Sequence, residues 1–190
     1  MRQELATIRS QGIKIIFIDE TVFTRKAMMK FEWARKHENM AVDEKLLNEP
    51  TKALLMGISA EKGVEQYRVF DRSVNIKKFI QYLQMVRDAH GEEPVALFMD
   101  NLSVHRSKKS KAKMEELNIR WVFNLPYQCE LNPIELVFSK VKQKFKTQRA
   151  ESLVRGKRPN IHTLIMRSVK CLKKEEIGNC IVHAQRLLEE

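Results

Sequence analysis

Three uninterrupted apolar runs stand out along the chain, and each ends beside polar residues. They are residues 13–20 (IKIIFIDE), 95–100 (VALFMD) and 119–125 (IRWVFNL). Runs of this length without alternation are typical of strands buried on both faces of a sheet. Two further apolar stretches, residues 53–59 and 64–70, flank a Lys62-Gly63 turn and predict an antiparallel pair. Weak alternation in residues 30–36 predicts one more strand.

Between and after these runs the apolar residues recur at helical spacing. Residues 75–90 place an apolar stripe on one face, and Gly91 is expected to close this helix. Residues 107–117 predict a strongly basic helix. A longer helix is expected from about Pro133 to residue 148. Residues 151–160 contain Gly, Pro and a basic cluster, which indicates a linker, and residues 161–188 predict one or two helices.

This order of elements predicts an α/β fold. Early strands joined by tight turns favour antiparallel pairing, whereas the later alternation of strand and helix favours parallel βα units. We therefore expect a mixed sheet flanked by helices. With 190 residues and 22.4 kDa, the chain fits one domain. Its expected division is residues 1–150 for the main unit and residues 151–190 for a helical extension of the same domain.

Charge is unevenly distributed. The chain has 35 Lys and Arg against 24 Asp and Glu, a net charge of +11. Residues 1–100 hold 16 basic and 15 acidic side chains, whereas residues 101–190 hold 19 and 9. Such a surplus favours a polyanionic partner, with nucleic acid first and an anionic membrane second, although solvated lysine-rich helix faces would give the same count.

Cysteine usage and hydropathy predict an intracellular location. Three widely spaced cysteines make no disulfide framework. Neither a signal peptide nor the run of roughly 18 apolar residues that spans a membrane is evident. We expect a protein that is not secreted, located in the nucleus of a eukaryote or in the cytoplasm or nucleoid of a bacterium.

Three acidic residues stand where strands end or a helix starts. Asp19 and Asp100 each follow an apolar run, and Glu135 falls in the first turn after Pro133. Any one of them taken singly is more often a cap or a dipole partner than a catalyst. Together, at neighbouring strand ends, they can converge as oxygen ligands, a donor set that suits Mg²⁺ or Mn²⁺ rather than zinc. Paired ions of this kind catalyse phosphodiester chemistry.

The three acids lie in three ordered motifs. These are FIDETVF (17–23), LFMDNLSVHRS (97–107) and LPYQCELNPIE (125–135), with 34 residues between Asp100 and Glu135. This arrangement resembles the signature blocks of mariner-superfamily transposases, which are DDE endonucleases with an RNase H-like fold. The resemblance covers about residues 13–148.

The resemblance implies that Asp19, Asp100 and Glu135 are catalytic and ligate two Mg²⁺ or Mn²⁺ ions. Together with the basic surplus, it implies substrate or DNA contacts for Asn101, His105, Arg106, Lys108, Lys109 and Lys142. Asn101 could equally be a capping residue and His105 a packed one, or either could orient Asp100. Asn132 and Pro133 are expected to fix the start of the helix that carries Glu135.

Some features depart from the family pattern. Gln128-Cys129 stands where relatives commonly have Ser-Pro, and Phe138 replaces a usual Trp, changes that affect loop shape and packing rather than the acids. Trp33 matches a tryptophan often found on the second strand and is expected in the core. Relatives also carry helix-turn-helix modules ahead of the catalytic domain, and twelve residues before the first strand are too few for them. We expect an excised catalytic domain or a shortened, domesticated descendant.

The implied reaction is metal-assisted cleavage of DNA at an element's ends, followed by transfer of the 3′-hydroxyl to target DNA. Because transposition joins two ends at one target, the resemblance also implies a homodimer or larger assembly on DNA, without a membrane partner. Two alternatives remain: an RNase H-like nuclease or resolvase without strand transfer, and a non-catalytic DNA-binding module. The intact set of acids argues against the second alternative.

Overall fold

The computed structural model describes residues 1–24, 51–157 and 159–189. Five strands form a single sheet: Lys14–Phe23 (β1), Lys52–Ser59 (β2), Gly63–Asp71 (β3), Val95–Met99 (β4) and Ile119–Phe123 (β5). Their spatial order is β3-β2-β1-β4-β5. Pairing is antiparallel across β1, β2 and β3 and parallel across β1, β4 and β5. The mixed sheet predicted from the sequence is confirmed, and β1 is its central strand.

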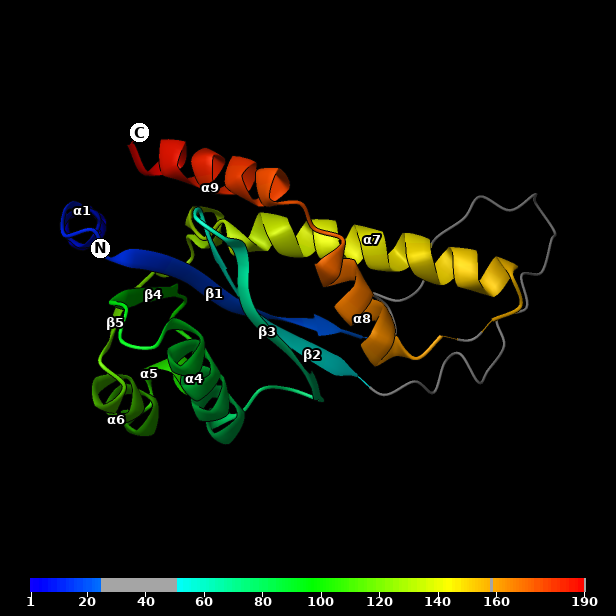
Figure 1. Cartoon of the computed structure of the whole chain (residues 1–190), viewed down its shortest axis with the longest axis horizontal. Coiled ribbons are helices and arrows are strands. Elements are labelled where there is room, and N and C mark those ends of the chain that lie inside the picture. Colours follow the sequence, from blue (N-terminus) through cyan, green and yellow to red (C-terminus); the bar gives the residue numbers. More distant parts are fainter. Residues whose placement is uncertain (25–50, 158, 190) are drawn as a thin grey trace.

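Helices cover both faces of this sheet (Figure 1). In chain order they are Arg2–Ser10 (α1), Ile76–His90 (α4), Ser103–Arg106 (α5), Lys108–Glu116 (α6), Ile134–Val154 (α7), Ile161–Lys170 (α8) and Lys174–Glu189 (α9), with a 3₁₀ turn at Cys129–Leu131 (η1). Residues 161–188 thus form two helices rather than one. No helix within the described ranges has the length and apolar character needed to cross a membrane.

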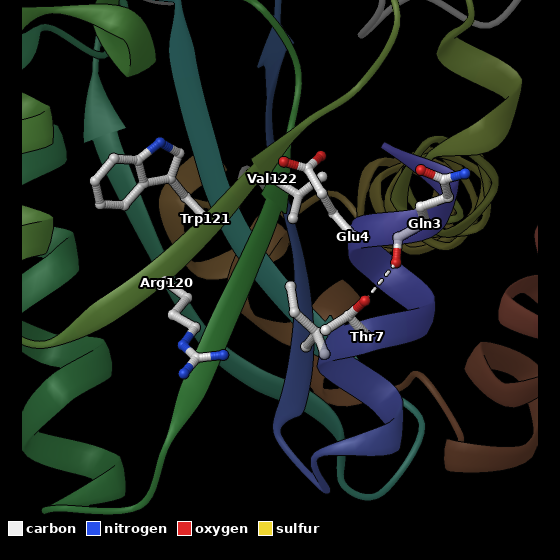
Figure 2. Close-up of a pocket in the computed structure, with 7 residues that line it drawn as sticks. Gln3, Glu4, Thr7, Arg120, Trp121 and Val122 are labelled. Atoms are coloured by element: carbon white, nitrogen blue, oxygen red, sulfur yellow. Dashed lines mark hydrogen bonds between the residues drawn. The ribbon is translucent and has the colours of Figure 1, made fainter.

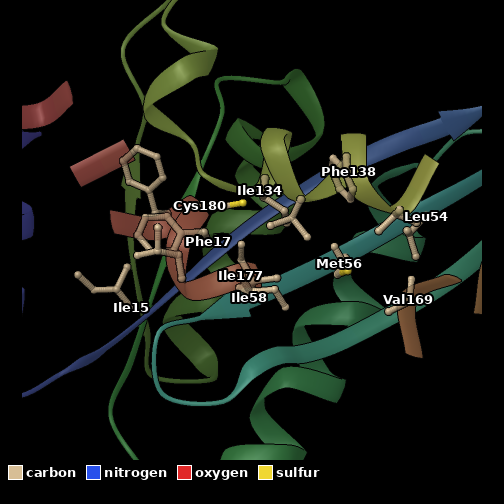
Figure 3. Packing of buried hydrophobic residues seen from close by; sticks show 14 of the residues in the cluster. Ile15, Phe17, Leu54, Met56, Ile58, Ile134, Phe138, Val169, Ile177 and Cys180 are labelled. Carbon is tan, nitrogen blue, oxygen red and sulfur yellow. The ribbon is translucent and has the colours of Figure 1, made fainter. Parts of the chain in front are cut away.

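Each face of the sheet has its own hydrophobic core, because successive residues of β1 point in opposite directions. Ile15 and Phe17 pack with residues of α1, α7, α8 and α9 (Figure 3). Ile16 and Ile18 pack on the other side with α4 and α6. Burial on both faces explains why residues 15–18 of β1 are continuously apolar rather than alternating.

Several predicted boundaries were wrong. Helix α7 continues to Val154, so the predicted linker begins inside it and the expected division at residue 150 falls within a helix. Helix α1 was not predicted, because only Leu5 and Ile8 of its nine residues are buried against the core. The short helix α5 was also missed. The strand expected at residues 30–36, with Trp33, lies outside the described residues.

The ends of helix α4 could be predicted from the sequence, because a capping residue stands at each end. The Asn75 side chain accepts a hydrogen bond from the Lys78 amide at 3.0 Å and starts the helix. Gly91 follows its last residue with a φ of 56°, in the left-handed region that favours glycine. The predicted closure by Gly91 is confirmed.

At position 57 on β2, the surrounding side chains leave room only for glycine. A Cβ atom there would lie 2.7 Å from the Tyr82 hydroxyl and 2.9 Å from Ile16 Cγ2. We expect Gly57→Ala to lower the free energy of unfolding by about 1–3 kcal/mol through overpacking. Gly178→Ala on α9, where a Cβ meets no atom within 4 Å, is the control and should raise it by about 0.5–1 kcal/mol. Urea unfolding measures both; equal effects would contradict the packing explanation.

Candidate active site

Asp19 lies in the middle of β1 and is 6% exposed. The strand does not end at this acid, as the apolar run predicted, because its next four residues stay paired with β2 as far as Phe23. The Asp19 Oδ1 accepts a hydrogen bond from the Glu20 amide at 2.6 Å. Burial, together with the negative charges of Asp100 and Glu135, raises the pKa of Asp19 from 3.8 to about 7, although the Glu20 amide and His105 act to lower it. The ionised form of Asp19 is therefore disfavoured in the folded protein, because it is buried beside two other acids.

Asp100 directly follows β4 and is held by two donors. Its Oδ1 lies 2.7 Å from His105 Nδ1 and accepts a hydrogen bond from the Leu102 amide at 3.2 Å. His105, on α5, is completely buried, and its ring packs against that of Phe79 with centroids 4.7 Å apart. The histidine therefore fixes the orientation of Asp100 from inside the protein.

Glu135 is exposed in the first turn of α7, and Asn132 sets where that turn lies. The Asn132 side chain donates to the Ile18 carbonyl at 3.4 Å and accepts from the Ile134 amide at 3.5 Å. The Glu135 amide donates to the Asn132 carbonyl at 3.2 Å. Buried Asn132 thus ties the start of the Glu135 helix to the residue before Asp19.

The three acids share one edge of the sheet. Strands β1 and β4 are parallel and their last pair is Phe17 with Phe98, so Asp19 and Asp100 each lie two residues beyond it. The charges of Asp100 and Glu135 reach Asp19. Within residues 1–24, 51–157 and 159–189, however, no three His, Cys, Asp or Glu side chains are spaced as a ready-made metal site. The acids are electrostatically coupled without forming a closed cage.

Comparison with known proteins identifies the family of the chain that carries these acids. Residues 14–155 match the family model described as DDE superfamily endonuclease. The chain belongs to the DDE superfamily endonucleases. The match includes all three acids and the strands and helix that carry them. No curated protein sequence matches the chain significantly.

Solved structures agree with this DDE endonuclease fold at low sequence identity. The Mos1 strand transfer complex has a TM-score of 0.66 at 15% identity, over 99% of this chain and 57% of that one. The catalytic domain of Mos1 mariner transposase has a TM-score of 0.63 at 14% identity, over 99% and 86%. A simian T-cell lymphotropic virus intasome chain has 0.59 at 14%, over 82% and 46%. The chain spans 57% of the first of these relatives.

The residues predicted to contact substrate or DNA differ in how far they are exposed on the surface. Asn101 donates its side-chain amide to the Asn124 carbonyl, so it braces the neighbouring loop. The prediction that His105 contacts DNA is wrong, because the side chain has no exposed surface; its orienting role is the one the geometry supports. The remaining basic residues are accessible to different degrees: Arg106, Lys108 and Lys109 are exposed and Lys142 is half-buried.

Two polar residues at this edge were missed. Asn124 accepts from the Leu125 amide at 2.8 Å and donates to the Gln128 carbonyl at 2.6 Å, which shapes the loop after β5. Glu20 follows Asp19 on the opposite face, where burial raises its pKa against the effect of His105. Both stand at the end of an apolar run, the same signal that singled out Asp19 and Asp100.

A cavity of about 450 Å³ lies elsewhere, between α1 and the edge strand β5 (Figure 2). Its lining comes from α1 and β5: Gln3, Glu4, Thr7, Ile8, Arg120, Trp121 and Val122. None of the three acids lines this cavity.

The raised pKa of Asp19 predicts how stability depends on pH without divalent ions. Between its unfolded value of 3.8 and its folded value of about 7, the native state binds more protons than the unfolded state. Native stability should therefore decrease as pH rises through this window, by no more than about 4 kcal/mol. Asp19→Asn should remove this decrease.

Urea unfolding in EDTA at pH 4, 6 and 8 measures the effect. Asp88→Asn, at an exposed position on α4, is the matched control and should keep the wild-type slope. If wild type and Asp19→Asn show the same pH dependence, Asp19 is not the group responsible.

Proposed function

We propose that this domain is the catalytic part of a mariner-type DNA transposase, which cuts DNA at the ends of an element and joins the new 3′ ends to target DNA. The observation that carries this proposal is the coupling of buried Asp19 to Asp100 and Glu135 at one sheet edge. Family membership over residues 14–155 and likeness to the Mos1 catalytic domain support it.

The chemistry of the donor set suits a hard divalent cation. The three side chains offer only carboxylate oxygens, and their mutual repulsion raises the pKa of Asp19, a strain that a cation would relieve. Because their present spacing is not that of a closed site, we propose that Asp19, Asp100 and Glu135 draw together around two Mg²⁺ or Mn²⁺ ions. When bound, such ions activate the attacking oxygen and stabilise the leaving oxygen. The Mos1 catalytic domain was solved with Mn and with Mg.

The residues of the chain itself prepare this site. Asp19 must release its proton to become a ligand, so binding of a cation and loss of that proton are coupled. His105 holds the orientation of Asp100, as histidines and carboxylates behind metal ligands do in general. Asn132 keeps the first turn of α7 against β1.

The proposed partners are transposon-end and target DNA, bound by a homodimer or larger assembly. Arg106, Lys108 and Lys109 are exposed on α5 and α6, the helices that follow Asp100. Lysines of this kind contact phosphates and add affinity without reading sequence. The Mos1 structures include a paired-end complex with the left transposon end, which supports the same partner here.

Substitution of the acids tests catalysis. We expect Asp19→Asn, Asp100→Asn and Glu135→Gln each to reduce Mn²⁺-dependent nicking of supercoiled plasmid by at least about 100-fold, since replacing residues behind a metal ligand already costs up to that much. Glu130→Gln, an exposed acid close to Glu135, is the control and should retain activity. Retained nicking in all three variants would refute the assignment of the site.

Strand transfer is tested separately with pre-cleaved duplex ends, Mn²⁺ and plasmid target. Joined products support the transposase. Cutting without joining would favour the nuclease or resolvase, and DNA binding without any product would exclude both enzymes.

The contact between His105 and Asp100 gives a second prediction. Removal of the imidazole in His105→Ala should raise the metal concentration needed for half-maximal nicking by about 10- to 100-fold. His105→Asn keeps a donor near the Nδ1 position and should restore part of that loss. Titration with Mn²⁺ measures both variants; equal half-saturation values for His105→Ala and wild type would show that the histidine only fills the core.

A further inference from the structure

Apolar side chains are exposed around the catalytic edge more than elsewhere. Six large hydrophobic residues are exposed in the described ranges, and four of them lie on segments next to the acids: Leu102, Leu136 and, on the loop after β5, Leu125 and Tyr127. Leu102 follows Asp100 by two positions, and Leu136 is next to Glu135. Acids that hold divalent cations, with apolar surface beside them, fit a ligand that combines an anionic group, bound through the cations, with flat apolar faces.

Tyr127 is the extreme member of this rim. Its relative exposure is 102%, so its ring makes almost no contact with the rest of the protein. Its φ of 62° lies in the left-handed region that bulky side chains seldom adopt. A strained backbone that presents a fully exposed ring is a feature typical of ligand-contacting loops.

The loop that carries Tyr127 is rigidly attached to the catalytic edge. The Asn124 amide donates to the Met99 carbonyl at 2.8 Å, one residue before Asp100. The side chain of Asn124 closes the loop by bonding to the Leu125 amide and the Gln128 carbonyl. Asn101 donates to the Asn124 carbonyl from the other side. Tyr127 is thus positioned relative to Asp100 by backbone and side-chain hydrogen bonds.

We propose that the Tyr127 ring stacks on an unpaired nucleobase next to the phosphate that the acids act on, with Leu125 as an apolar neighbour on the same loop. The inference rests on the proposed function, since it takes DNA as the substrate. A phosphate at the acids leaves the adjoining base at this rim, and aromatic side chains hold unpaired bases by stacking regardless of base identity. Tyr127 then positions the strand for cleavage and is not itself a metal ligand.

A set of variants separates the effect of the Tyr127 ring from the effect of the loop conformation. Tyr127→Asn removes the ring while keeping a residue that tolerates positive φ, and Tyr127→Phe keeps the ring without the hydroxyl. Val154→Ala, at an apolar position with 89% exposure at the end of α7, is the matched control. The thermal midpoints of all variants are compared first, and unchanged values show that the loop substitutions leave the fold intact.

The probe is a forked DNA duplex with a short unpaired arm, with Ca²⁺ as the cation. We expect Tyr127→Asn to bind about tenfold more weakly than wild type, through the lost stacking. Tyr127→Phe and Val154→Ala should stay within about twofold of wild type. A 2-aminopurine beside the fork should be quenched by wild type and by Tyr127→Phe, and should stay bright with Tyr127→Asn.

Abasic sites placed one at a time along the unpaired arm identify the base. At one position the abasic site should weaken wild-type binding as much as Tyr127→Asn does, and should weaken that variant no further. Fully additive losses, or equal binding by wild type and Tyr127→Asn, would overturn the inference while the proposed function stands. So would a Tyr127→Asn effect confined to oligomeric state in size-exclusion chromatography. A wild-type domain that neither binds nor nicks any DNA would refute the proposed function and the stacking with it.

Discussion

The burial of the Asp19 carboxyl group is the constraint on which the rest of the site depends. β1 is the central strand and is packed on both faces, so a polar group in its middle has little access to water. Its pKa of about 7 expresses that cost together with the repulsion from Asp100 and Glu135. A domain that keeps such a group retains an internal electrostatic strain, which the proposed divalent cations would relieve.

Asparagine and histidine side chains position the segments that carry the other acids, through hydrogen bonds. Asn132 links α7 to β1, and His105 holds Asp100 from beneath the surface. Asn124 connects the loop after β5 to the end of β4 and so to the same edge. These three residues are buried, so the side chains that position the acids are themselves held in place by packing.

The strands of this fold were predictable because β1 and β4 are buried on both faces and therefore show unbroken apolar runs. Helix α4 was predictable from its stripe and its caps, Asn75 and Gly91. Helix α1 was not, because its two buried residues, Leu5 and Ile8, make too short a pattern. The end of α7 was also missed: the helix continues to Val154 and ends just before Gly156, whose φ is 67°.

The sequence by itself determined which acids could matter, because Asp19 and Asp100 each follow an apolar run and Glu135 opens a helix, in a family-specific order. Only the tertiary structure decided that His105 is buried behind Asp100 rather than exposed to DNA, and that Tyr127 stands wholly in solvent. The reason is physical: strand and helix formation depend on periodicity within one segment. Burial and pKa depend on what other segments pack against a side chain, and neighbours along the chain do not carry that information.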